Sequence, residues 1–315
     1  MTWRISLVIL VLSITSCSDE KSGTIGANEQ YIESAGTDYL IEVDELLEIA
    51  NNPNIKILDF RKPEFYNEGH LKGALNIWRT DIEDMSYAYK GMMAGREQLE
   101  TLFSNLGISN NDSIIIYDDN ALCDASRLWW LLQNYDLTKV RLFHGGITAW
   151  KAKKGAISTE VPIVNKTSFK VTKTPSMRLY VSKDEMLAAV INKSIILDAR
   201  TTDEYSGKIQ KKGSAKAGRI PNSKLIDWAD AVNFDGDKKL KPKDELQKMY
   251  SALIDSKIDT VIVYCHSGVR SAHTTFVLTE ILGYKNVKNY DGSWTEWSQF
   301  NDLPYERDTV ITLIN

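Results

Sequence analysis

The sequence has few of the residues that hold small secreted domains together or bind metals. Only three cysteines occur in 315 residues, and none belongs to a Cys-x-x-Cys pair, which argues against a disulfide framework and a structural zinc site. No basic run exceeds two residues and the net charge is −4, so we expect no nucleic-acid partner. There is no glycine-rich phosphate motif, and we expect neither a cofactor nor a metal. What is present, with 43% hydrophobic and 25% charged residues, is typical of a folded chain of two domains.

The longest apolar run lies at the N-terminus and is too short to cross a membrane. Residues 5–14 follow Arg4 and are mostly apolar, whereas a membrane span needs about 20 such residues. This length suits a signal peptide, and its end, with small residues just before Cys17, resembles the lipobox of bacterial lipoproteins. The resemblance implies that residues 1–17 are a signal peptide, that Cys17 is lipidated, and that 18–37 is a flexible tether. We therefore expect a lipid-anchored protein of the bacterial cell envelope, with an ordinary signal peptide and an incidental cysteine as the alternative.

The rest of the chain contains two copies of one sequence unit. Ile114–Tyr117 corresponds to Val261–Tyr264, with a spacing of 264 − 117 = 147 residues. The later Gly-x4-Trp segments of the two copies have the same spacing. Further upstream Asp59 corresponds to Asp198, and 198 − 59 gives only 139. The second copy therefore carries an insertion, which we place in the lysine-rich segment 208–216.

Each copy alternates short β-branched runs with helical patterns. The runs 114–117 and 260–264 are predicted to be parallel strands, and 97–106 and 182–191 are predicted to be helices. This alternation predicts an α/β fold in which each domain has a mostly parallel sheet flanked by helices on both faces. The predicted boundaries are 38–157 for domain 1, 158–176 for a linker, and 177–315 for domain 2.

The residue that carries the chemistry is Cys265, directly after the strand 260–264 and before a predicted helix over 272–282. Ligands of parallel sheets gather at the carboxyl ends of the strands. The positive end of the helix and the charge of Arg270 both favour a thiolate. Gly268 lets the loop turn so that successive amides cradle an anion. This pattern indicates a nucleophilic cysteine rather than a buried structural one.

These residues resemble the tandem-domain sulfurtransferases of the rhodanese superfamily. The resemblance covers about residues 38–305, and its marks are the loop Cys265–Arg270, the segment Asp291–Trp297 and the segment His70–Ala74. In that family the first domain lacks the cysteine, and here Asp118 stands at the matching position. The resemblance implies that domain 1 is a scaffold and substrate wall and that domain 2 performs catalysis.

The resemblance also implies a mechanism. A sulfane sulfur passes from a small anionic donor to Cys265, and the persulfide gives it to cyanide or a thiol. Arg270 would hold the anionic group of the donor, and Ser267 would hydrogen-bond the donor or the sulfur. From domain 1, His70 and Asp59 would approach the cysteine, with Asp59 either orienting His70 or serving as an ion-pair partner at a strand end. The expected substrate-binding residues are His266, Gly268, Val269 and Lys212. We expect a monomer.

The donor remains open between thiosulfate and 3-mercaptopyruvate. Mercaptopyruvate enzymes use an arginine for the substrate carboxylate, and Glu204 matches its position and would repel a carboxylate. Doubly charged thiosulfate facing Arg270 is the better electrostatic match, so the sequence favours thiosulfate.

A phosphatase and a non-catalytic binding module are the alternative functions, and domain 1 contains a further cysteine. Phosphatases of this kind place five residues between the cysteine and the arginine, whereas only four separate Cys265 from Arg270 here. A non-catalytic, lipid-anchored binding module is the second alternative, but the intact cysteine and arginine argue against it. Cys123 matches the position of Arg270, because 123 + 147 = 270, and is interpreted as a buried bystander rather than a redox partner.

Overall fold

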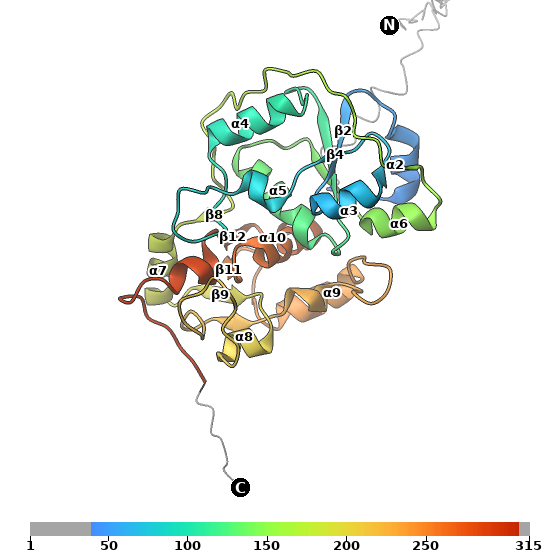
Figure 1. The fold of residues 1–315 in the computed structure, drawn as a ribbon. Helices are drawn as coiled ribbons and strands as arrows, with labels where there is room; N and C mark the ends of the chain where they lie inside the picture. The colour runs from blue at the N-terminus through green and yellow to red at the C-terminus, as the bar shows by residue number, and fades with distance from the viewer. Residues whose placement is uncertain (1–38, 309–315) are drawn as a thin grey trace, which may run out of the picture. The chain divides into compact units, whose positions relative to one another are not determined.

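Two five-stranded parallel sheets, one in each domain, form the fold (Figure 1). The computed structural model describes residues 39–308, so the predicted signal peptide, Cys17 and the tether lie outside the described residues. Within the described part, no helix is long and apolar enough to cross a membrane.

The sheets have the same strand order, which is the structural counterpart of the sequence repeat. Domain 1 has the order β1-β6-β5-β2-β4 and domain 2 the order β8-β12-β11-β9-β10. The strands of domain 1 are β1 (Leu40–Ile41), β2 (Ile55–Asp59), β4 (Leu75–Asn76), β5 (Ser113–Tyr117) and β6 (Val140–Phe143). Those of domain 2 are β8 (Tyr180–Val181), β9 (Ile195–Asp198), β10 (Lys224–Leu225), β11 (Thr260–Tyr264) and β12 (Asn286–Tyr290). The predicted parallel α/β architecture is confirmed.

Helices flank both sheets. In domain 1 they are α2 (Val43–Ile49), α3 (Pro63–Glu68), η1 (Arg79–Ile82), α4 (Arg96–Asn105), α5 (Cys123–Asn134) and α6 (Gly146–Ala152). In domain 2 they are α7 (Lys183–Ile191), α8 (Thr202–Ser206), η2 (Trp228–Ala231), α9 (Lys243–Ser251), α10 (Val269–Phe276), the π-helical turn η3 (Val277–Ile281) and α11 (Ser293–Trp297). Ser182 caps α7 by accepting the N–H of Glu185, and the Glu185 side chain accepts the N–H of Ser182 in return.

One predicted helix boundary is wrong by three residues. The sequence predicts a helix from Ala272, but α10 begins at Val269. The reason is Gly268, whose φ of 76° turns the chain sharply into the helix immediately after the loop. The helix N-terminus therefore lies closer to Cys265 than the sequence pattern indicates.

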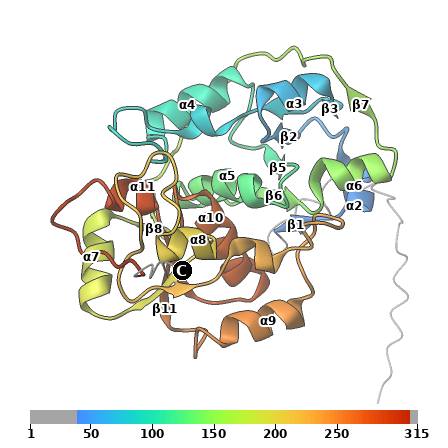
Figure 2. The same cartoon turned by 60° about the horizontal axis from the view of Figure 1, so that its bottom comes forward.

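Helices α5 and α10 form the main contact between the two domains, and both views show them side by side (Figures 1 and 2). Every residue of α5 is buried, as expected for a helix covered by its own sheet on one side and by domain 2 on the other. The rings of Trp129 and Phe276 meet edge to face across the contact, with centroids 4.9 Å apart. A single hydrophobic cluster thus includes residues of both domains.

The segment predicted to be a linker is partly packed onto domain 1. Where predicted domain 1 meets the linker, Ile157–Ser158 form β7, which pairs with β3 (His70–Leu71) in a small antiparallel sheet. Further along, Phe169 is buried against Phe103 of α4, with ring centroids 5.0 Å apart. The domain boundaries themselves stay a prediction.

Candidate active site

Cys265 lies in the loop between β11 and α10, and its side chain is buried. The loop is held in shape by Ser293, whose Oγ accepts the N–H groups of Cys265 and Gly268, each at 3.1 Å. Ser271, in the first turn of α10, donates its hydroxyl to the Cys265 Sγ at 3.3 Å. The thiol is therefore fixed beside the N-terminus of a helix.

The surroundings of Cys265 favour its thiolate. Burial alone would raise the pKa of the thiol, but the charge of Arg270 lowers it, as do the hydroxyl and N–H of Ser271 and the N–H of Ser267. The net result is a pKa below the ordinary value for cysteine. The arrangement therefore provides a nucleophilic sulfur in a site that excludes most water.

Arg270 forms an ion pair within the protein that the sequence does not predict. Its two terminal nitrogens donate to the two carboxylate oxygens of Glu204 at 2.7 and 2.8 Å, and both side chains are largely buried. The guanidinium fork thus binds Glu204 in this structure, and the role of Arg270 in holding the donor stays a prediction. Burial would raise the pKa of Glu204, but its hydrogen bond to Arg270 and the charge of that arginine lower it to about 2. Glu204 is therefore ionised at pH 7, and its negative charge balances the positive charge of Arg270.

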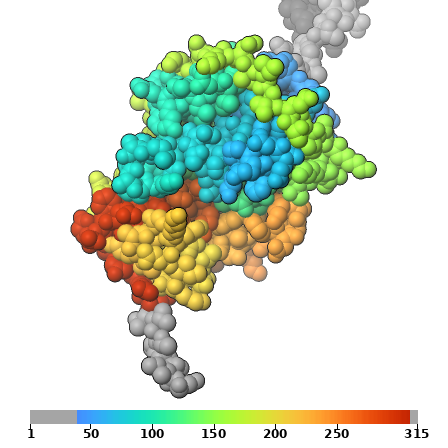
Figure 3. Space-filling view, in the orientation of Figure 1, coloured from blue at the N-terminus to red at the C-terminus, as the bar shows by residue number. Residues whose placement is uncertain are grey.

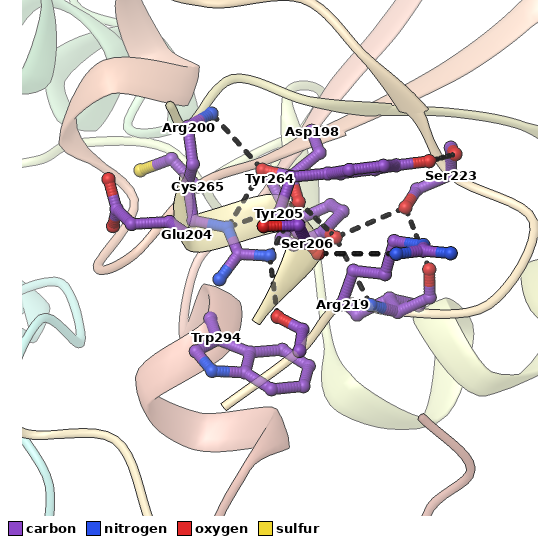
Figure 4. A network of polar contacts seen from close by, with 12 residues as sticks. Asp198, Arg200, Glu204, Tyr205, Ser206, Arg219, Ser223, Tyr264, Cys265 and Trp294 are labelled. Carbon is purple, nitrogen blue, oxygen red and sulfur yellow. Dashed lines mark hydrogen bonds and ion pairs between the residues drawn. The ribbon is translucent and has the colours of Figure 1, made fainter. Parts of the chain in front are cut away.

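Asp59 forms the strand-end ion pair, which was one of its two predicted roles. Its carboxylate binds Arg61, with Nη2 and Oδ2 2.6 Å apart, and accepts the hydroxyl of Tyr117. Domain 2 repeats this unit at the end of β9, where Asp198 binds Arg200 at 2.6 Å and accepts the hydroxyl of Tyr264 at 2.5 Å (Figure 4). Because the same triad recurs in both domains, it is part of the fold, and the expectation that Asp59 orients His70 is not met.

His70 also has partners of its own. Its ring stacks on Tyr66 with the centroids 3.7 Å apart, and its Nδ1 lies 2.9 Å from the carbonyl oxygen of Tyr66. Its Nε2 lies 3.1 Å from the carbonyl oxygen of Glu160, beside the pairing of β3 with β7. The structure therefore places His70 in the packing of domain 1 and does not bring it to Cys265, contrary to the expectation from the resemblance.

The other predicted binding residues lie around the loop. His266 donates its Nε2–H to the carbonyl oxygen of Lys212 at 3.0 Å, and burial lowers the pKa of His266 to about 4, so the ring is neutral at pH 7. Lys212 thus contributes its backbone to the site, through the insertion 208–216. Ser267 and Val269 line a cavity of about 270 Å³, whereas Gly268 shapes the turn and directs its carbonyl oxygen to Asn289.

Sequence reasoning missed the domain 1 side of this cavity. Its wall includes Trp78 and Arg79 at the start of η1 together with Lys90 and Met92. The segment between η1 and α4 reaches domain 2, where Tyr89 donates to Glu296 at 2.7 Å (Figure 3, in which cyan atoms meet red ones). No motif marks these residues, because the cavity arises only from the packing of the two domains.

Arg79 lies within reach of the charge on the active thiol. Its Nε donates to Asp124 Oδ1 at 2.5 Å, and its guanidinium lies over the ring of Trp78. Burial would lower the pKa of Arg79, but Asp124, Cys123 and Cys265 together raise it above its ordinary value. Unlike Arg270, its side chain is 40% exposed.

The equivalent loop of domain 1 holds a carboxylate in place of the thiol. Asp118 accepts four backbone N–H groups in its own loop, from residues 120, 122, 124 and 125, at 2.9 to 3.1 Å. Adding 147 gives residues 267, 269, 271 and 272, and two of these, Ser267 and Ser271, donate their N–H to Cys265. The two loops thus share one arrangement of amides, which suits a buried anion.

Cys123 is unpaired and buried, at the start of α5. Burial raises the pKa of its thiol well above the ordinary value. Its thiol is therefore protonated at neutral pH, in contrast to the thiol of Cys265. Among the described residues, no group of three or more His, Cys, Asp or Glu side chains is placed to hold a metal ion.

Comparison with known protein families gives two matches within the chain. The model of the rhodanese-like domain matches residues 42–153 and again residues 182–300. A Mycolicibacterium smegmatis protein named "Putative thiosulfate sulfurtransferase" is 36% identical over 249 residues, which cover 76% of this chain and 87% of that protein. The "Sulfur carrier protein TtuD" of Thermus thermophilus is 33% identical over 283 residues, covering 86% and 97%.

Solved structures show the same architecture. SseA from Escherichia coli, described as a 3-mercaptopyruvate sulfotransferase with the rhodanese fold, is 26% identical, with a TM-score of 0.72 over 82% of this chain and 99% of SseA. An anaerobic ergothioneine biosynthesis enzyme from Chlorobium limicola has a TM-score of 0.76 over 86% of this chain and 70% of that one. At 22% identity, the latter likeness concerns the fold alone.

Proposed function

Since the chain belongs to the rhodanese family, we propose that it is a sulfurtransferase that carries sulfur as a persulfide on Cys265. The observation that carries this proposal is the buried thiol with a lowered pKa at a helix N-terminus, surrounded by inward-facing amides. The names of relatives that are 33 to 36% identical over most of the chain support it.

In the first half-reaction the Cys265 thiolate attacks the outer sulfur of the donor. With thiosulfate, the sulfur–sulfur bond of the donor breaks, its electron pair leaves with sulfite, and the transferred sulfur stays on Cys265 as a persulfide. Covalent catalysis of this kind divides one difficult transfer into two easier ones. The N–H groups of the loop, whose twins hold the Asp118 carboxylate, stabilise the negative charge on the outer sulfur.

We propose thiosulfate as the donor. The sequence favours thiosulfate because its double negative charge would face Arg270. In the structure Glu204 already balances the charge of this arginine, so this reason carries less weight. The names of several relatives now carry the preference. The likeness to SseA favours 3-mercaptopyruvate as the alternative donor. Measuring turnover on the two donors side by side decides between them.

The test of the proposed function is cyanide-dependent formation of thiocyanate. Wild-type protein is expected to turn over, and Cys265→Ala is expected to be inactive while Cys123→Ala keeps its activity. No turnover by a folded wild type with either donor would instead favour the binding module, and hydrolysis of a phosphate ester dependent on Cys265 would favour the phosphatase.

We also propose that Cys17 is lipidated and anchors the protein in the cell envelope. The support is the sequence that precedes Cys17 and the acidic, small-residue stretch that follows it. Several acyl chains together give stable membrane attachment, since each buried CH₂ contributes about 0.8 kcal/mol. Fractionation tests this: the wild type should sediment with membranes and Cys17→Ser should not. A Cys17→Ser protein that still sediments with membranes contradicts the proposal.

A further inference from the structure

Asn289 is a fully buried amide in β12, the strand next to the one that ends at Cys265. Its Nδ2 donates to the carbonyl oxygen of Gly268, in the catalytic loop, at 3.1 Å. Its Oδ1 has no hydrogen-bond partner among the described residues. Burying an amide that is only partly hydrogen-bonded costs free energy. The strand therefore carries this cost for one side-chain hydrogen bond, which it makes to the catalytic loop.

The matching strand of domain 1 shows that the fold does not require an amide at this position. Leu142 of β6 is the twin of Asn289, because 142 + 147 = 289. Leu142 is opposite Ile116 in its sheet, and Asn289 is opposite Val263, the twin of Ile116. Leu142 is buried in a hydrophobic cluster. An apolar side chain thus fills this place in the inactive domain, and the amide is found in the domain that holds the cysteine.

A cation from domain 1 lies beside the same carbonyl oxygen. Nη1 of Arg127, in α5, is 3.5 Å from the oxygen of Gly268, and a Cβ at Gly268 would lie 2.7 Å from this nitrogen. Arg127 is itself fixed, because its Nη2 binds the buried carboxylate of Asp291 at 2.6 Å and the carbonyl oxygen of Gly91 at 2.6 Å. The oxygen of Gly268 is therefore held by its own domain through Asn289 and approached by the other domain through Arg127.

Holding this oxygen also orients the N–H group that follows it. In a trans peptide, the C=O of Gly268 and the N–H of Val269 point in opposite directions. The twin of Val269 is Leu122, because 122 + 147 = 269, and its N–H donates to the Asp118 carboxylate at 3.0 Å. By this equivalence the N–H of Val269 faces the place beside the Cys265 sulfur that a carboxylate oxygen takes in domain 1.

We infer that Asn289, supported by Arg127, is a positioning residue that aims the N–H of Val269 at the outer sulfur of the Cys265 persulfide. The inference rests on the proposed function and adds a residue to the same site. The N–H groups of Ser267 and Ser271 already act on the sulfur of the free thiol. The N–H of Val269 acts on the outer sulfur, which is present only in the persulfide. Loss of the Asn289 amide should therefore change the persulfide and leave the free thiol as it is.

The experiment compares the persulfide with the free thiol in one variant. Asn289→Leu introduces the residue of the twin position, which cannot donate to Gly268. Protein loaded with thiosulfate and freed of excess donor, and unloaded protein, are alkylated with iodoacetamide over a range of pH and followed by intact mass. The midpoint of the loaded profile should move upward by about one pH unit relative to wild type, the size expected for one hydrogen bond to a charged group. The unloaded profile should match that of the wild type.

A matched control separates positioning from a general loss of stability. Asn134 is also fully buried, and its Nδ2 donates to the carbonyl oxygen of Trp130 at 3.0 Å, away from the catalytic loop. Asn134→Leu should lower stability and leave both profiles unchanged. Asn289→Val, whose branched side chain suits a strand, takes the place of Asn289→Leu if the larger residue prevents folding.

Two results would overturn the inference. One is a folded Asn289 variant whose loaded profile equals that of the wild type. The other is an equal shift of the loaded and unloaded profiles, which would show that the amide acts on the loop as a whole. Failure of the wild type to load sulfur would instead be the failure of the proposed function.

Discussion

The loops after β5 and β11 occupy equivalent places in the two domains but hold different side chains. In domain 1 the Asp118 carboxylate fills the amide cradle from within, at 2.9 to 3.1 Å from four N–H groups. In domain 2 the side chain of Cys265 is shorter than that of Asp118, and its sulfur accepts the N–H groups of Ser267 and Ser271. The arrangement of loop N–H groups is therefore a feature of the fold. The side chain at the end of the strand decides whether these groups bind a carboxylate of the protein or the sulfur of a cysteine.

The two loops also differ in the charge of the residue beside them. Arg270 lies beside the thiol, whereas Cys123 occupies the matching position beside Asp118. Only domain 2 therefore combines the cradle with a cation that favours the thiolate. Domain 1 instead supplies α5, which packs on α10, and one wall of the cavity.

The largest expected effect comes from removing the cation from the active loop. Arg270→Gln should lower the rate of persulfide formation at pH 7 by about tenfold or more, since a rise of one unit in the pKa of Cys265 leaves about a tenth of the thiolate. Glu204→Gln should shift the pKa the other way, because it leaves Arg270 uncompensated. The pH dependence of alkylation by iodoacetamide measures both shifts. Equal alkylation profiles for the two variants and the wild type would contradict the role of the pair.

The next effect concerns one backbone position that the two loops share. Gly268 has φ of 76°, and a Cβ there would lie 2.6 Å from the carbonyl oxygen of Asp291. Its twin is Ala121, at φ of 53°, because 121 + 147 = 268. Gly268→Ala should therefore lower the free energy of unfolding by about 1–3 kcal/mol and reduce activity. The matched change Ala121→Gly should leave stability within about 1 kcal/mol and activity intact. Urea unfolding and turnover measure both, and equal losses in the two variants would show that the loops do not differ here.

A third prediction concerns the pH dependence of stability. Burial and the neighbouring Asp124 raise the pKa of Asp118 from 3.8 to about 7. A carboxyl whose pKa is raised on folding stabilises fully below its unfolded pKa, and this contribution is lost as the pH rises through about 7. From pH 5 to pH 7.5 the wild type should lose about 2–3 kcal/mol that Asp118→Asn does not lose. Urea unfolding at the two pH values tests this, and parallel changes in both proteins would contradict it.

The smallest expected effect sharpens the comparison by rebuilding the lost site. In a Cys265→Ala background, Asp118→Cys should restore slow uptake of sulfur from thiosulfate in domain 1, because the amides are already in place. Adding Cys123→Arg should increase the rate, since it supplies the cation of the active loop. Intact mass after exposure to the donor measures the uptake. A folded double or triple variant that takes up no sulfur would show that the cradle alone does not make a sulfur site.

The sequence predicts the duplicated fold and the position of Cys265 well. The spacing of 147 residues relates β5 to β11, and the strand followed by Cys265 and Gly268 identifies the loop. It does not predict the partner of Arg270, because Glu204 lies 66 residues away, on the far side of the insertion. Contacts of this kind depend on tertiary packing rather than on a local pattern.

The domain 1 contribution to the site is the part that the sequence predicts incorrectly. The segment beginning at His70 matches a family motif, but β3 pairs with β7 and keeps its histidine in the packing of domain 1. Trp78 and Arg79 carry no motif, yet the turn η1 places them at the cavity. The packing of α5 on α10 decides which residues of domain 1 face domain 2. No recognisable pattern in the sequence marks these residues.

The most direct measurement is the intact mass of the protein after brief exposure to thiosulfate and removal of the excess. The account predicts that the wild type gains the mass of one sulfur atom, that cyanide removes it, and that Cys265→Ala gains none. A folded wild type that gains no sulfur from either thiosulfate or 3-mercaptopyruvate, or a gain that persists in Cys265→Ala, would contradict the claim that this loop carries the transferred sulfur.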